Sequence, residues 1–533
     1  MASQADKMKD SALGVSSPPR RRRLRGLLVA CSALLAVQVL SGGAVAQAAE
    51  TAPRTPTAAR VAEQGRPNVL LIISDDLNTR LGTYGGAALT PNIDRLASEG
   101  VRFDQAYSQF PWCAPSRASF LTGLRPSAVG VLDLHTPLRN KVADLVTLPE
   151  YFRQSGYFTA RSGKIFHQEV PSGVGHAGPD DPQSWNVALN PAGRDLPLEP
   201  KMHNLTPGLG RGSTLGWLDG DGPDNAYTDG KVADDVIALL SRQKTGGQPF
   251  FIAAGFYRPH TPEISPKAYF ERYPQASIAT TPVKDATKPL DITSAWSPDD
   301  FGMNTEEQKA FIRAYYASTS YMDAQVGRIL EALKARGLDR NTIVVFVSDH
   351  GFLLGEHHQW MKNVLWEQST RVPLIIRAPG MAGNGGQSGK LVELVDLFPT
   401  LVDLAGLKPV AANQGSSMAG LLKDPGDKAW DKPAFSQIAG GRSVRSGPWR
   451  YTEWQAGKLG RELYNVEQDP QEARNLVDDP ANAAVIARLS AMLPKDVEVR
   501  RKPLAYDPAA DCLHMPPNLA KAVGTACQAR LDP

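Results

Sequence analysis

The feature that most constrains the fold of this chain is a pair of short apolar runs, each of which ends in acidic residues. Residues 68–73 (NVLLII) lead, after one serine, into Asp75 and Asp76, and residues 342–347 (TIVVFV) lead in the same way into Asp349. Continuous apolar runs of this kind are typical of strands buried on both faces of a sheet. In open α/β sheets, functional groups lie beyond the carboxyl ends of such strands. The two runs therefore predict three carboxylates at one edge of a sheet.

Other apolar runs alternate with segments of helical spacing. The further strand candidates are residues 157–160, 249–256 and 372–376, and the helix candidates are residues 93–97, 148–153, 229–240 and 306–335. Buried strands that alternate with helices favour an α/β fold with a mostly parallel sheet. We therefore expect a large, mixed but mostly parallel central sheet that is flanked by helices.

The sequence changes in character beyond about residue 406, where apolar runs shorten and proline and glycine increase. Residues 443–454 (SVRSGPWRYTEW) alternate like the strands of a meander or a hairpin. We therefore predict a main domain over residues 67–409 and a smaller α+β subdomain over residues 410–533. Residues 50–66, which are rich in Ala, Thr, Pro and Arg, are expected to be a linker.

The first 49 residues have the pattern of a cleavable signal peptide. Five arginines between positions 20 and 25 precede an apolar run over residues 27–40, and residues 44–48 offer two Ala-x-Ala cleavage sites. The apolar run is too short to span a membrane comfortably, so an uncleaved anchor is the weaker alternative. Arg21, Arg22 and Leu24 resemble a bacterial twin-arginine signal. We expect a periplasmic or secreted protein that keeps no contact with the membrane after cleavage.

The composition excludes one kind of partner and singles out one cysteine. The 533 residues carry a formal net charge of only +3, and the basic residues are dispersed outside the N-terminus, whereas nucleic-acid binding needs a basic patch. Cys31 belongs to the signal peptide, and Cys512 and Cys527 are close enough in sequence to suggest a disulfide in an oxidising compartment. Cys113 is then left over, which marks it as a candidate reactive thiol. By default we expect a monomer.

Three carboxylates at one edge of a sheet would repel one another unless a cation lies between them. A hard divalent cation with oxygen ligands fits Asp75, Asp76 and Asp349, and calcium suits a carboxylate-rich, loosely built site. The alternative is that Asp75 and Asp349 only cap the segments that follow them, as aspartates often do. Two strands that end in the same way favour the metal site over the caps.

A second candidate site surrounds Cys113, in the string Cys-Ala-Pro-Ser-Arg over residues 113–117. Pro115 favours the first turn of a helix, so Cys113 is expected just ahead of a helix N-terminus, where exposed N–H groups attract anions. Arg117 adds a charge whose fork matches the oxygens of sulfate or phosphate. A thiolate nucleophile and a buried structural cysteine are both compatible with these residues alone.

The string Cys113-x-Pro115-Ser-Arg117, completed by Leu-Thr-Gly at residues 121–123, resembles the signature of the formylglycine-dependent (type I) sulfatases of the alkaline-phosphatase-like superfamily. The resemblance extends from residue 67 to about residue 476. It implies that a formylglycine-generating enzyme oxidises Cys113 to an aldehyde, formylglycine. In that family the aldehyde hydrates to a diol, one hydroxyl attacks sulfur, and the other later expels sulfate.

The same resemblance implies a set of metal ligands. Asp75 and Asp76 match the family's first metal pair, and Asp349 with His350 matches the second. These four residues and the modified Cys113 would hold one Ca²⁺. The histidine at position 350, where many sulfatases carry asparagine, is similar to the iduronate-2-sulfatase branch of the family.

The remaining chemistry needs cations for the sulfate and groups that move protons. Lys164 and His167 follow the strand candidate at residues 157–160, which places them at the same carboxyl edge. Lys164 would neutralise sulfate oxygens, and His167 would bond to the diol and take its proton. His260, which follows another strand candidate, is the candidate general acid for the leaving alcohol. Lys362 matches the family's second sulfate-contacting lysine, which would stabilise charge as the S–O bond breaks.

These residues predict an enzyme that hydrolyses sulfate monoesters to an alcohol and inorganic sulfate. The branch resemblance implies a sulfated carbohydrate as substrate, and the loops at residues 180–228 and 276–300, together with His135, would wall its pocket. Three alternatives stay open: a phosphonate monoester or phosphodiester hydrolase of the same superfamily, a choline or alkyl sulfatase, and a non-catalytic protein that binds sulfated glycans. The last of these would not need every catalytic position to be filled, as it is here.

Overall fold

The computed structural model describes residues 65–281, 285–293 and 299–494. The predicted signal peptide, nearly all of the predicted linker, and Cys31, Cys512 and Cys527 lie outside the described residues. Signal cleavage and the disulfide therefore stay predictions. Within the described part of the chain, Cys113 is a free thiol.

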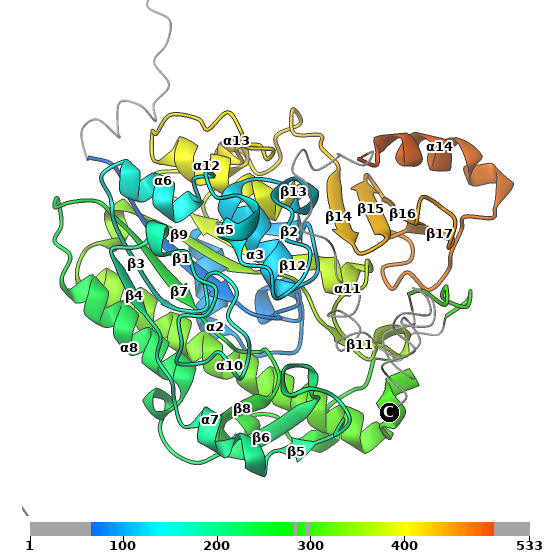
Figure 1. Ribbon diagram of the computed structural model, residues 1–533, viewed down its shortest axis with the longest axis horizontal. Coiled ribbons are helices and arrows are strands. Elements are labelled where there is room, and N and C mark those ends of the chain that lie inside the picture. Colours follow the sequence, from blue (N-terminus) through cyan, green and yellow to red (C-terminus); the bar gives the residue numbers. More distant parts are fainter. Residues whose placement is uncertain (1–64, 282–284, 294–298, 495–533) are drawn as a thin grey trace, which may run out of the picture. The chain divides into compact units, whose positions relative to one another are not determined.

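An eight-stranded sheet forms the centre of the described chain (Figure 1), in the order β13-β2-β12-β9-β1-β7-β3-β4. Its strands are β1 (Asn68–Ser74), β2 (Val101–Tyr107), β3 (Phe158–Gly163), β4 (Val187–Leu189), β7 (Phe250–Gly255), β9 (Thr342–Ser348), β12 (Arg371–Arg377) and β13 (Gln387–Glu393). Every neighbouring pair is parallel except the two that involve β12, which runs antiparallel to β2 and β9. The sheet is mixed and mostly parallel, which confirms the predicted fold class.

The central strands are covered on both faces because both of their faces are apolar. Along β1, Val69, Leu71 and Ile73 join the core on one face, and Leu70 and Ile72 join the core on the other. Helices pack on each core and make a three-layer arrangement (Figure 1). They are α3 (Cys113–Thr122), α6 (Leu148–Gln154) and α12 (Leu397–Leu404) on the first face, and α2 (Pro91–Glu99), α8 (Thr228–Ser241) and α10 (Thr305–Ala335) on the second.

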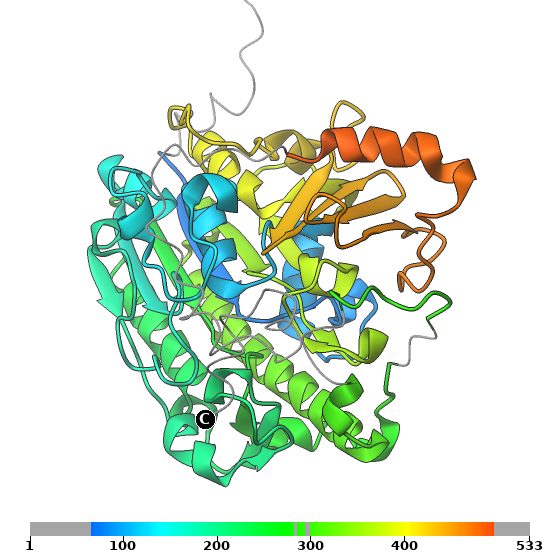
Figure 2. The ribbon, with the colours of Figure 1, turned by 45° about the vertical axis from the view of Figure 1, so that its right-hand side comes forward.

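Two smaller sheets accompany the central one. A three-stranded sheet of β5 (His203–Asn204), β6 (Gly216–Gly220) and β8 (Glu263–Pro266) packs against α10. A four-stranded antiparallel sheet, the C-terminal sheet, carries α14 (Ala483–Met492) on one side (Figure 2) and consists of β14 (Ala434–Ile438), β15 (Gly441–Ser446), β16 (Trp449–Trp454) and β17 (Arg461–Asn465). The hairpin predicted at residues 443–454 is its central pair, β15 and β16. The other short elements are α4 (Pro126–Val129), α5 (Leu138–Lys141), α7 (Asp195–Leu198), α9 (Lys267–Phe270), β10 (Leu353–Leu354), β11 (Trp360–Met361), α11 (Glu367–Thr370) and α13 (Ala419–Lys423).

Buried ion pairs join the C-terminal sheet to the rest of the chain. The guanidinium of Arg450, on β16, pairs with Glu367, and its Nε lies 2.6 Å from Oε1 of Glu472. Glu472 also accepts a hydrogen bond from the backbone N–H of Glu367 (2.6 Å). All three residues are buried. The domain boundary between residues 409 and 410 stays a prediction.

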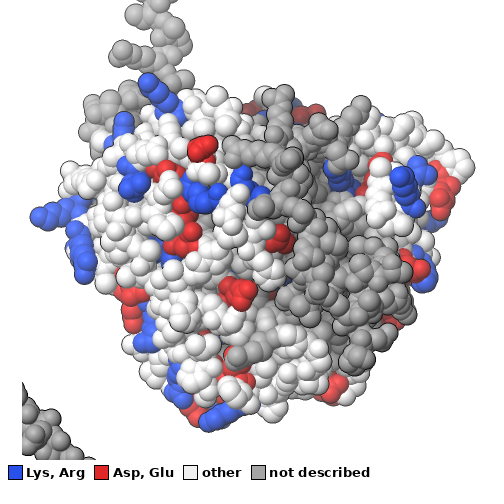
Figure 3. All heavy atoms as spheres, viewed as in Figure 1, with Lys and Arg blue, Asp and Glu red and all other residues white. Residues whose placement is uncertain are grey.

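Among the described residues, no helix combines the length and the apolarity that crossing a membrane requires. On the face drawn in Figure 3, lysine and arginine side chains are interspersed with acidic ones. The visible part of that face therefore carries no large patch of a single charge.

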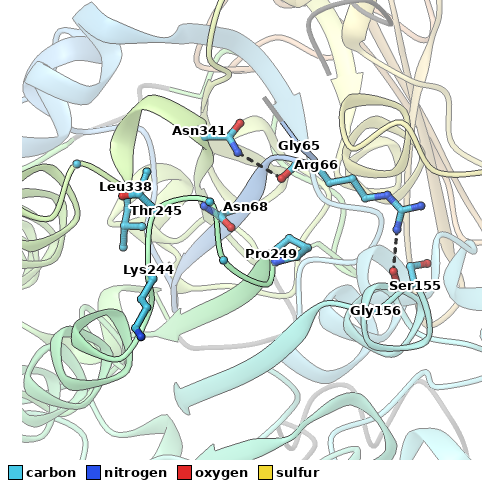
Figure 4. A pocket seen from close by; sticks show the side chains of 13 residues that line it. Gly65, Arg66, Asn68, Ser155, Gly156, Lys244, Thr245, Pro249, Leu338 and Asn341 are labelled. Atoms are coloured by element: carbon cyan, nitrogen blue, oxygen red, sulfur yellow. Dashed lines mark hydrogen bonds between the residues drawn. The ribbon is translucent and has the colours of Figure 1, made fainter. Parts of the chain in front are cut away.

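A hollow of about 390 Å³ opens at the amino edge of the central sheet (Figure 4). Arg66 lies at its rim, donates to the carbonyl oxygen of Ser155 (2.8 Å) and receives a bond from Asn341 at its own carbonyl oxygen (3.3 Å). Asn68, which also lines the hollow, begins β1, and Asn341 directly precedes β9. The hollow is therefore at the opposite end of these strands from the acidic residues that follow them.

Candidate active site

The acidic residues of the two apolar strands meet at the carboxyl edge of the sheet. β1 and β9 pair in parallel with Ser74 opposite Ser348, so the residues that follow, Asp75 and Asp349, lie next to each other. The backbone N–H of Asp76 lies 3.3 Å from Oδ1 of Asp349. All three carboxylates are fully buried. The strand register thus brings together acids that are more than 270 positions apart.

Cys113 stands at the first residue of α3 and points into this group of acids. Its Sγ lies 3.4 Å from Oδ1 of Asp75, 3.2 Å from Nε2 of His350 and 3.3 Å from Nζ of Lys362. The sequence places Cys113 just ahead of the helix, whereas α3 begins at Cys113 itself. The reason is that Trp112 has extended backbone and its carbonyl accepts the first helical hydrogen bond (3.0 Å). The thiol is therefore part of the helix and is enclosed by the site.

Arg117, one turn along α3, forms ion pairs with two of the acids. Its Nε donates to Oδ2 of Asp349 (2.8 Å), and its Nη2 lies 3.5 Å from Oδ1 of Asp75. Its Nη1 donates to the carbonyl oxygens of Lys164 and Ile165 (2.6 and 3.1 Å). The sequence assigns this fork to sulfate or phosphate oxygens, but in this structure carboxylates engage it. A buried guanidinium needs anionic partners, and the nearest are these aspartates.

Two lysines reach the same acids from other elements. Lys164 follows β3 and pairs with Asp75, and Lys362 follows β11 and pairs with Asp76. Burial works against the charge of Lys362, but Asp76 beside it raises the lysine pKa. Burial also opposes ionisation of Asp75, yet Lys164 and the other cations hold the pKa of Asp75 well below its usual value. Asp75 and Lys362 therefore keep their charges at neutral pH.

Asp76 is the acid whose carboxylate is least well paired by neighbouring groups. Its Oδ2 is buried and has no hydrogen-bond partner among the described residues. Burial, together with repulsion from Asp75 and Asp349, raises the pKa of Asp76 to about 7 in spite of Lys362. A further positive charge beside Asp76 would relieve this repulsion.

Four side chains are close enough to hold one metal ion. Asp75, Asp76, Cys113 and His350 each offer one ligand atom, and these atoms lie within 4.8 Å of one another. Asp349 adjoins them, with its Oδ2 3.7 Å from Nε2 of His350. Burial lowers the pKa of His350 to about 4, so its imidazole is neutral and able to bind a cation. Carboxylate oxygens with one unpartnered member fit a divalent cation.

Two further histidines border the group, and both are buried and neutral. Burial, with Lys164 next, lowers the pKa of His167 well below its usual value, and burial, with Lys362 next, does the same for His260. Nε2 of His260 lies 3.7 Å from Oδ2 of Asp76, and its Nδ1 lies 2.6 Å from the carbonyl oxygen of the next residue. Neither ring nitrogen of His167 has a hydrogen-bond partner among the described residues. A buried imidazole of this kind is suited to bond an incoming polar group.

Two glycines let the ends of β3 and β7 approach each other beneath Lys164. The backbone N–H of Lys164 donates to the carbonyl oxygen of Gly255 (2.9 Å). A Cβ on Gly163 would lie 2.1 Å from that oxygen, and Gly163 has a φ of +76°. A side chain at position 163 would therefore separate the strands and move Lys164 away from Asp75.

The structure brings the predicted site residues together at this edge. Contacts join Asp75, Asp76, Cys113, Arg117, Lys164, His260, Asp349, His350 and Lys362. His167 lies close enough to Lys164 for that lysine to lower its pKa. The catalytic roles of these residues stay predictions. His135, the candidate pocket residue, is half-exposed and has its Nδ1 3.6 Å from Glu169.

Sequence reasoning missed two buried groups behind Asp76. Tyr315, on α10, donates to the carbonyl oxygen of Asp76 (2.7 Å) and accepts from the N–H of Asn78 (2.9 Å), which supports the left-handed φ of 63° at Asp76. Glu263, on β8, is fully buried, and neither carboxylate oxygen has a hydrogen-bond partner among the described residues. Helical spacing along α10 could have placed Tyr315 inward. No sequence pattern marks Glu263.

Replacement of Glu263 by glutamine is expected to flatten the pH dependence of stability. Burial raises the pKa of Glu263 from 4.5 to about 8, so the folded protein keeps a proton that the unfolded chain has already released. The stability that this proton provides is complete below about pH 4.5 and is lost as the pH rises through about 8, whereas glutamine does not ionise. In urea titrations, the free energy of unfolding of the variant minus that of the wild type should rise with pH between about 5 and 8. A difference that does not change with pH would contradict this account.

The carboxyl edge of this α/β sheet gathers buried carboxylates, cations and a cysteine, an arrangement typical of hydrolases of anionic esters. The chain matches the family model described as Sulfatase over residues 67–407 and the one described as N-sulphoglucosamine sulphohydrolase, C-terminal, over residues 355–499. It belongs to the sulfatase family and is a sulfuric ester hydrolase.

Relatives and solved structures agree with this assignment. Iduronate 2-sulfatase of Mus musculus is 32% identical over 79% of this chain and 93% of its own length, and that of Homo sapiens is 32% identical over 83% and 95%. A choline-sulfatase of Rhizobium meliloti is 28% identical over 80% and 85%. A solved 2-O GAG sulfatase has a TM-score of 0.64 at 25% identity and covers 80% of this chain and 90% of its own. The phosphonate monoester hydrolase of Agrobacterium radiobacter shares the fold, with a TM-score of 0.65 at 23% identity over 80% and 94%.

Proposed function

We propose that this sulfatase hydrolyses sulfate monoesters of carbohydrates with a formylglycine made from Cys113 and one bound calcium ion. The observation that carries the proposal is the position of Cys113 within 3.4 Å of Asp75, His350 and Lys362. Burial, with Asp75 next, raises the pKa of the Cys113 thiol far above its usual value, so a thiolate is disfavoured here. An oxidised derivative of Cys113 accounts for a cysteine among carboxylates, whereas a thiolate nucleophile does not.

The proposed groups would complete the site. A formylglycine at position 113 would supply a hydrated aldehyde as the oxygen nucleophile. Asp75, Asp76, Asp349 and His350 would hold the calcium ion, which supplies positive charge against the anionic ester.

The protein's own residues would bind the sulfate and move protons. Lys164 and Lys362 would each turn from an aspartate toward a sulfate oxygen and stabilise the charge that grows on the leaving group. His167 is neutral and its ring nitrogens are available, so it would accept the proton of the nucleophile. A sulfate beside His260 adds negative charge that raises the pKa of this histidine, which would then donate a proton to the leaving alcohol.

Replacement of His260 by alanine should harm poor leaving groups most. We expect kcat/KM to fall about 10²–10⁴-fold on an alkyl or sugar sulfate, because an alkoxide needs a proton as it leaves. On nitrophenyl sulfate, whose phenolate leaves without a proton, the loss should be less than about tenfold. His176→Ala, at an exposed position, is the matched control and should leave both rates unchanged. If kcat/KM fell equally on the two substrates, His260 would not be the general acid.

The substrate class is supported by the relatives. Two iduronate 2-sulfatases and a 2-O GAG sulfatase favour a 2-O-sulfated uronate, the choline-sulfatase keeps choline sulfate as a rival, and the phosphonate monoester hydrolase keeps phosphoryl esters as another. The first test compares the turnover of nitrophenyl sulfate with that of bis-nitrophenyl phosphate. The second measures sulfate release from defined sulfated disaccharides and from choline sulfate. We expect preference for the sulfate and then for a 2-O-sulfated uronate. Faster turnover of the phosphodiester would overturn the proposal.

Export and maturation are proposed from the sequence alone. We propose that a formylglycine-generating enzyme acts on the chain and that the protein is then exported to the periplasm or secreted as a monomer. A mature N-terminus near residues 45–50 and a sedimentation mass of one chain would support this. An intact N-terminus in the mature protein would contradict export by cleavage.

A further inference from the structure

Lys362, the cation beside Cys113 and Asp76, is carried by a strained hairpin. The hairpin joins β10 and β11, which pair in antiparallel orientation. Left-handed backbone occurs in or directly after it at four residues that are not glycine: His357 (φ 53°), His358 (φ 56°), Met361 (φ 73°) and Asn363 (φ 73°). Such angles are disfavoured for residues with a Cβ and persist only where the surroundings hold them. Lys362 stands between two of these residues, so its direction depends on the contacts that hold the hairpin.

His357 is enclosed by two such contacts. Its ring, only 1% exposed, stacks on Trp366 with 4.1 Å between the ring centroids and 28° between the ring planes. Its Nδ1 lies 2.7 Å from Oδ1 of Asp285. Position 357 is five residues before Lys362, and its side chain bonds neither the acids nor Cys113.

Both partners of His357 are tied to the C-terminal sheet. Trp366 packs in a cluster with Tyr464, on β17. The residue after Asp285 donates its backbone N–H to the carbonyl oxygen of Ala473 (2.9 Å), shortly beyond β17. The ring of His357 is therefore a link from the C-terminal sheet to the hairpin of Lys362.

We propose that His357 is a positioning residue for the sulfatase reaction and that it acts through Lys362, an inference that rests on the proposed role of this lysine. The stack on Trp366 and the bond to Asp285 hold the hairpin in its disfavoured backbone angles. When they are lost, the hairpin relaxes toward ordinary angles, and the ammonium group leaves Asp76 and Cys113. The site then loses one of the charges that face the sulfate.

The position of Lys362 can be measured without any catalytic assay. Its side chain is 12% exposed and paired with Asp76, so it should react slowly with an acetylating reagent, and peptide mass spectrometry can follow the reaction against the exposed Lys244. We expect His357→Ala to speed acetylation of Lys362 relative to Lys244 about tenfold or more, because the hairpin opens locally. His357→Phe keeps a ring on Trp366 but loses the bond to Asp285, and it should give an intermediate rate.

The matched control is His358→Ala. His358 is the next residue, has the same left-handed backbone and bonds Asp300 (2.7 Å), but its side chain is 52% exposed. Its replacement should change the acetylation rate of Lys362 less than about twofold. An unchanged rate in His357→Ala and His357→Phe, or an equal change in His358→Ala, would overturn the proposal.

A double-mutant comparison separates positioning from general destabilisation. His357→Ala should lower kcat/KM for the sulfate ester about 10–100-fold in the wild-type background and less than about threefold in a Lys362→Ala background, because its effect passes through Lys362. Effects that multiply would show that His357 acts by another route and would overturn the proposal. A wild-type protein without sulfatase activity would instead refute the proposed function, and the acetylation rates would still report whether His357 places Lys362.

Discussion

Replacement of Cys113 by alanine is expected to abolish sulfate ester hydrolysis, with kcat reduced about 10⁴-fold or more, while the substrate still binds. The nucleophile is proposed to come from this side chain alone, whereas Arg117, Lys164 and Lys362, which carry the positive charge, remain in place. Sulfate release measures the rate, and isothermal titration with a sulfated disaccharide measures the retained binding.

Three outcomes would contradict this expectation or its explanation. Hydrolysis by the variant at an undiminished rate would exclude residue 113 from the reaction. An active wild-type enzyme whose peptide over residues 113–117 has the mass of an unmodified cysteine would refute the formylglycine. Loss of binding together with hydrolysis would instead mean that the variant has lost the site as a whole.

Removal of divalent cations with EGTA is expected to reduce kcat/KM at least about 100-fold and to lower the melting temperature, and added Ca²⁺ should restore both. Asp75, Asp76 and Asp349 are fully buried together, and their mutual repulsion already helps burial to raise the pKa of Asp76 to about 7. An ion between them removes that repulsion in the folded state only, so it stabilises the fold by mass action.

The matched pair of variants is Asp349→Asn and Asp478→Asn. The first removes a charged ligand candidate and should weaken the dependence of the melting temperature on Ca²⁺, whereas the second changes an exposed acid of the C-terminal part and should leave it unchanged. If EGTA changed neither the melting temperature nor kcat/KM, a resident calcium ion would be ruled out.

Five strands of the central sheet, β1, β3, β7, β9 and β12, could be predicted because burial on two faces leaves a continuous apolar run. The other three, β2, β4 and β13, are only partly buried and were missed. The apolar runs at residues 68–73, 249–256 and 342–347 match β1, β7 and β9 to within one or two residues at each end. The small sheet of β5, β6 and β8 was missed because its strands are short and carry no such run: β5 is exposed, β6 is only partly buried, and β8 is buried but has the sequence EISP. A hydrophobic pattern predicts a strand only where the strand is long enough and apolar enough to produce one.

Some residues of the candidate site could also be predicted from sequence patterns, and others could not. Asp75 and Asp349 could be placed together because the end of a parallel strand fixes where the next residue lies. Lys362 could be found only by resemblance, since left-handed residues of ordinary type shape its hairpin and no local sequence preference favours them. His357 and Asp285 meet across 72 positions through a buried contact, and single-sequence reasoning has no signal for such a pair.

The enclosure of Cys113 limits when the proposed oxidation of this residue can occur. A side chain that is 1% exposed cannot enter the active site of another protein. One of the residues that seal it in, His350, lies 237 positions further along the chain. The proposed oxidising partner would therefore have to meet the segment while it is still a loose peptide, before the later strands dock on it. A cell that produces the chain faster than the proposed partner can oxidise it would accumulate folded molecules whose thiol is enclosed.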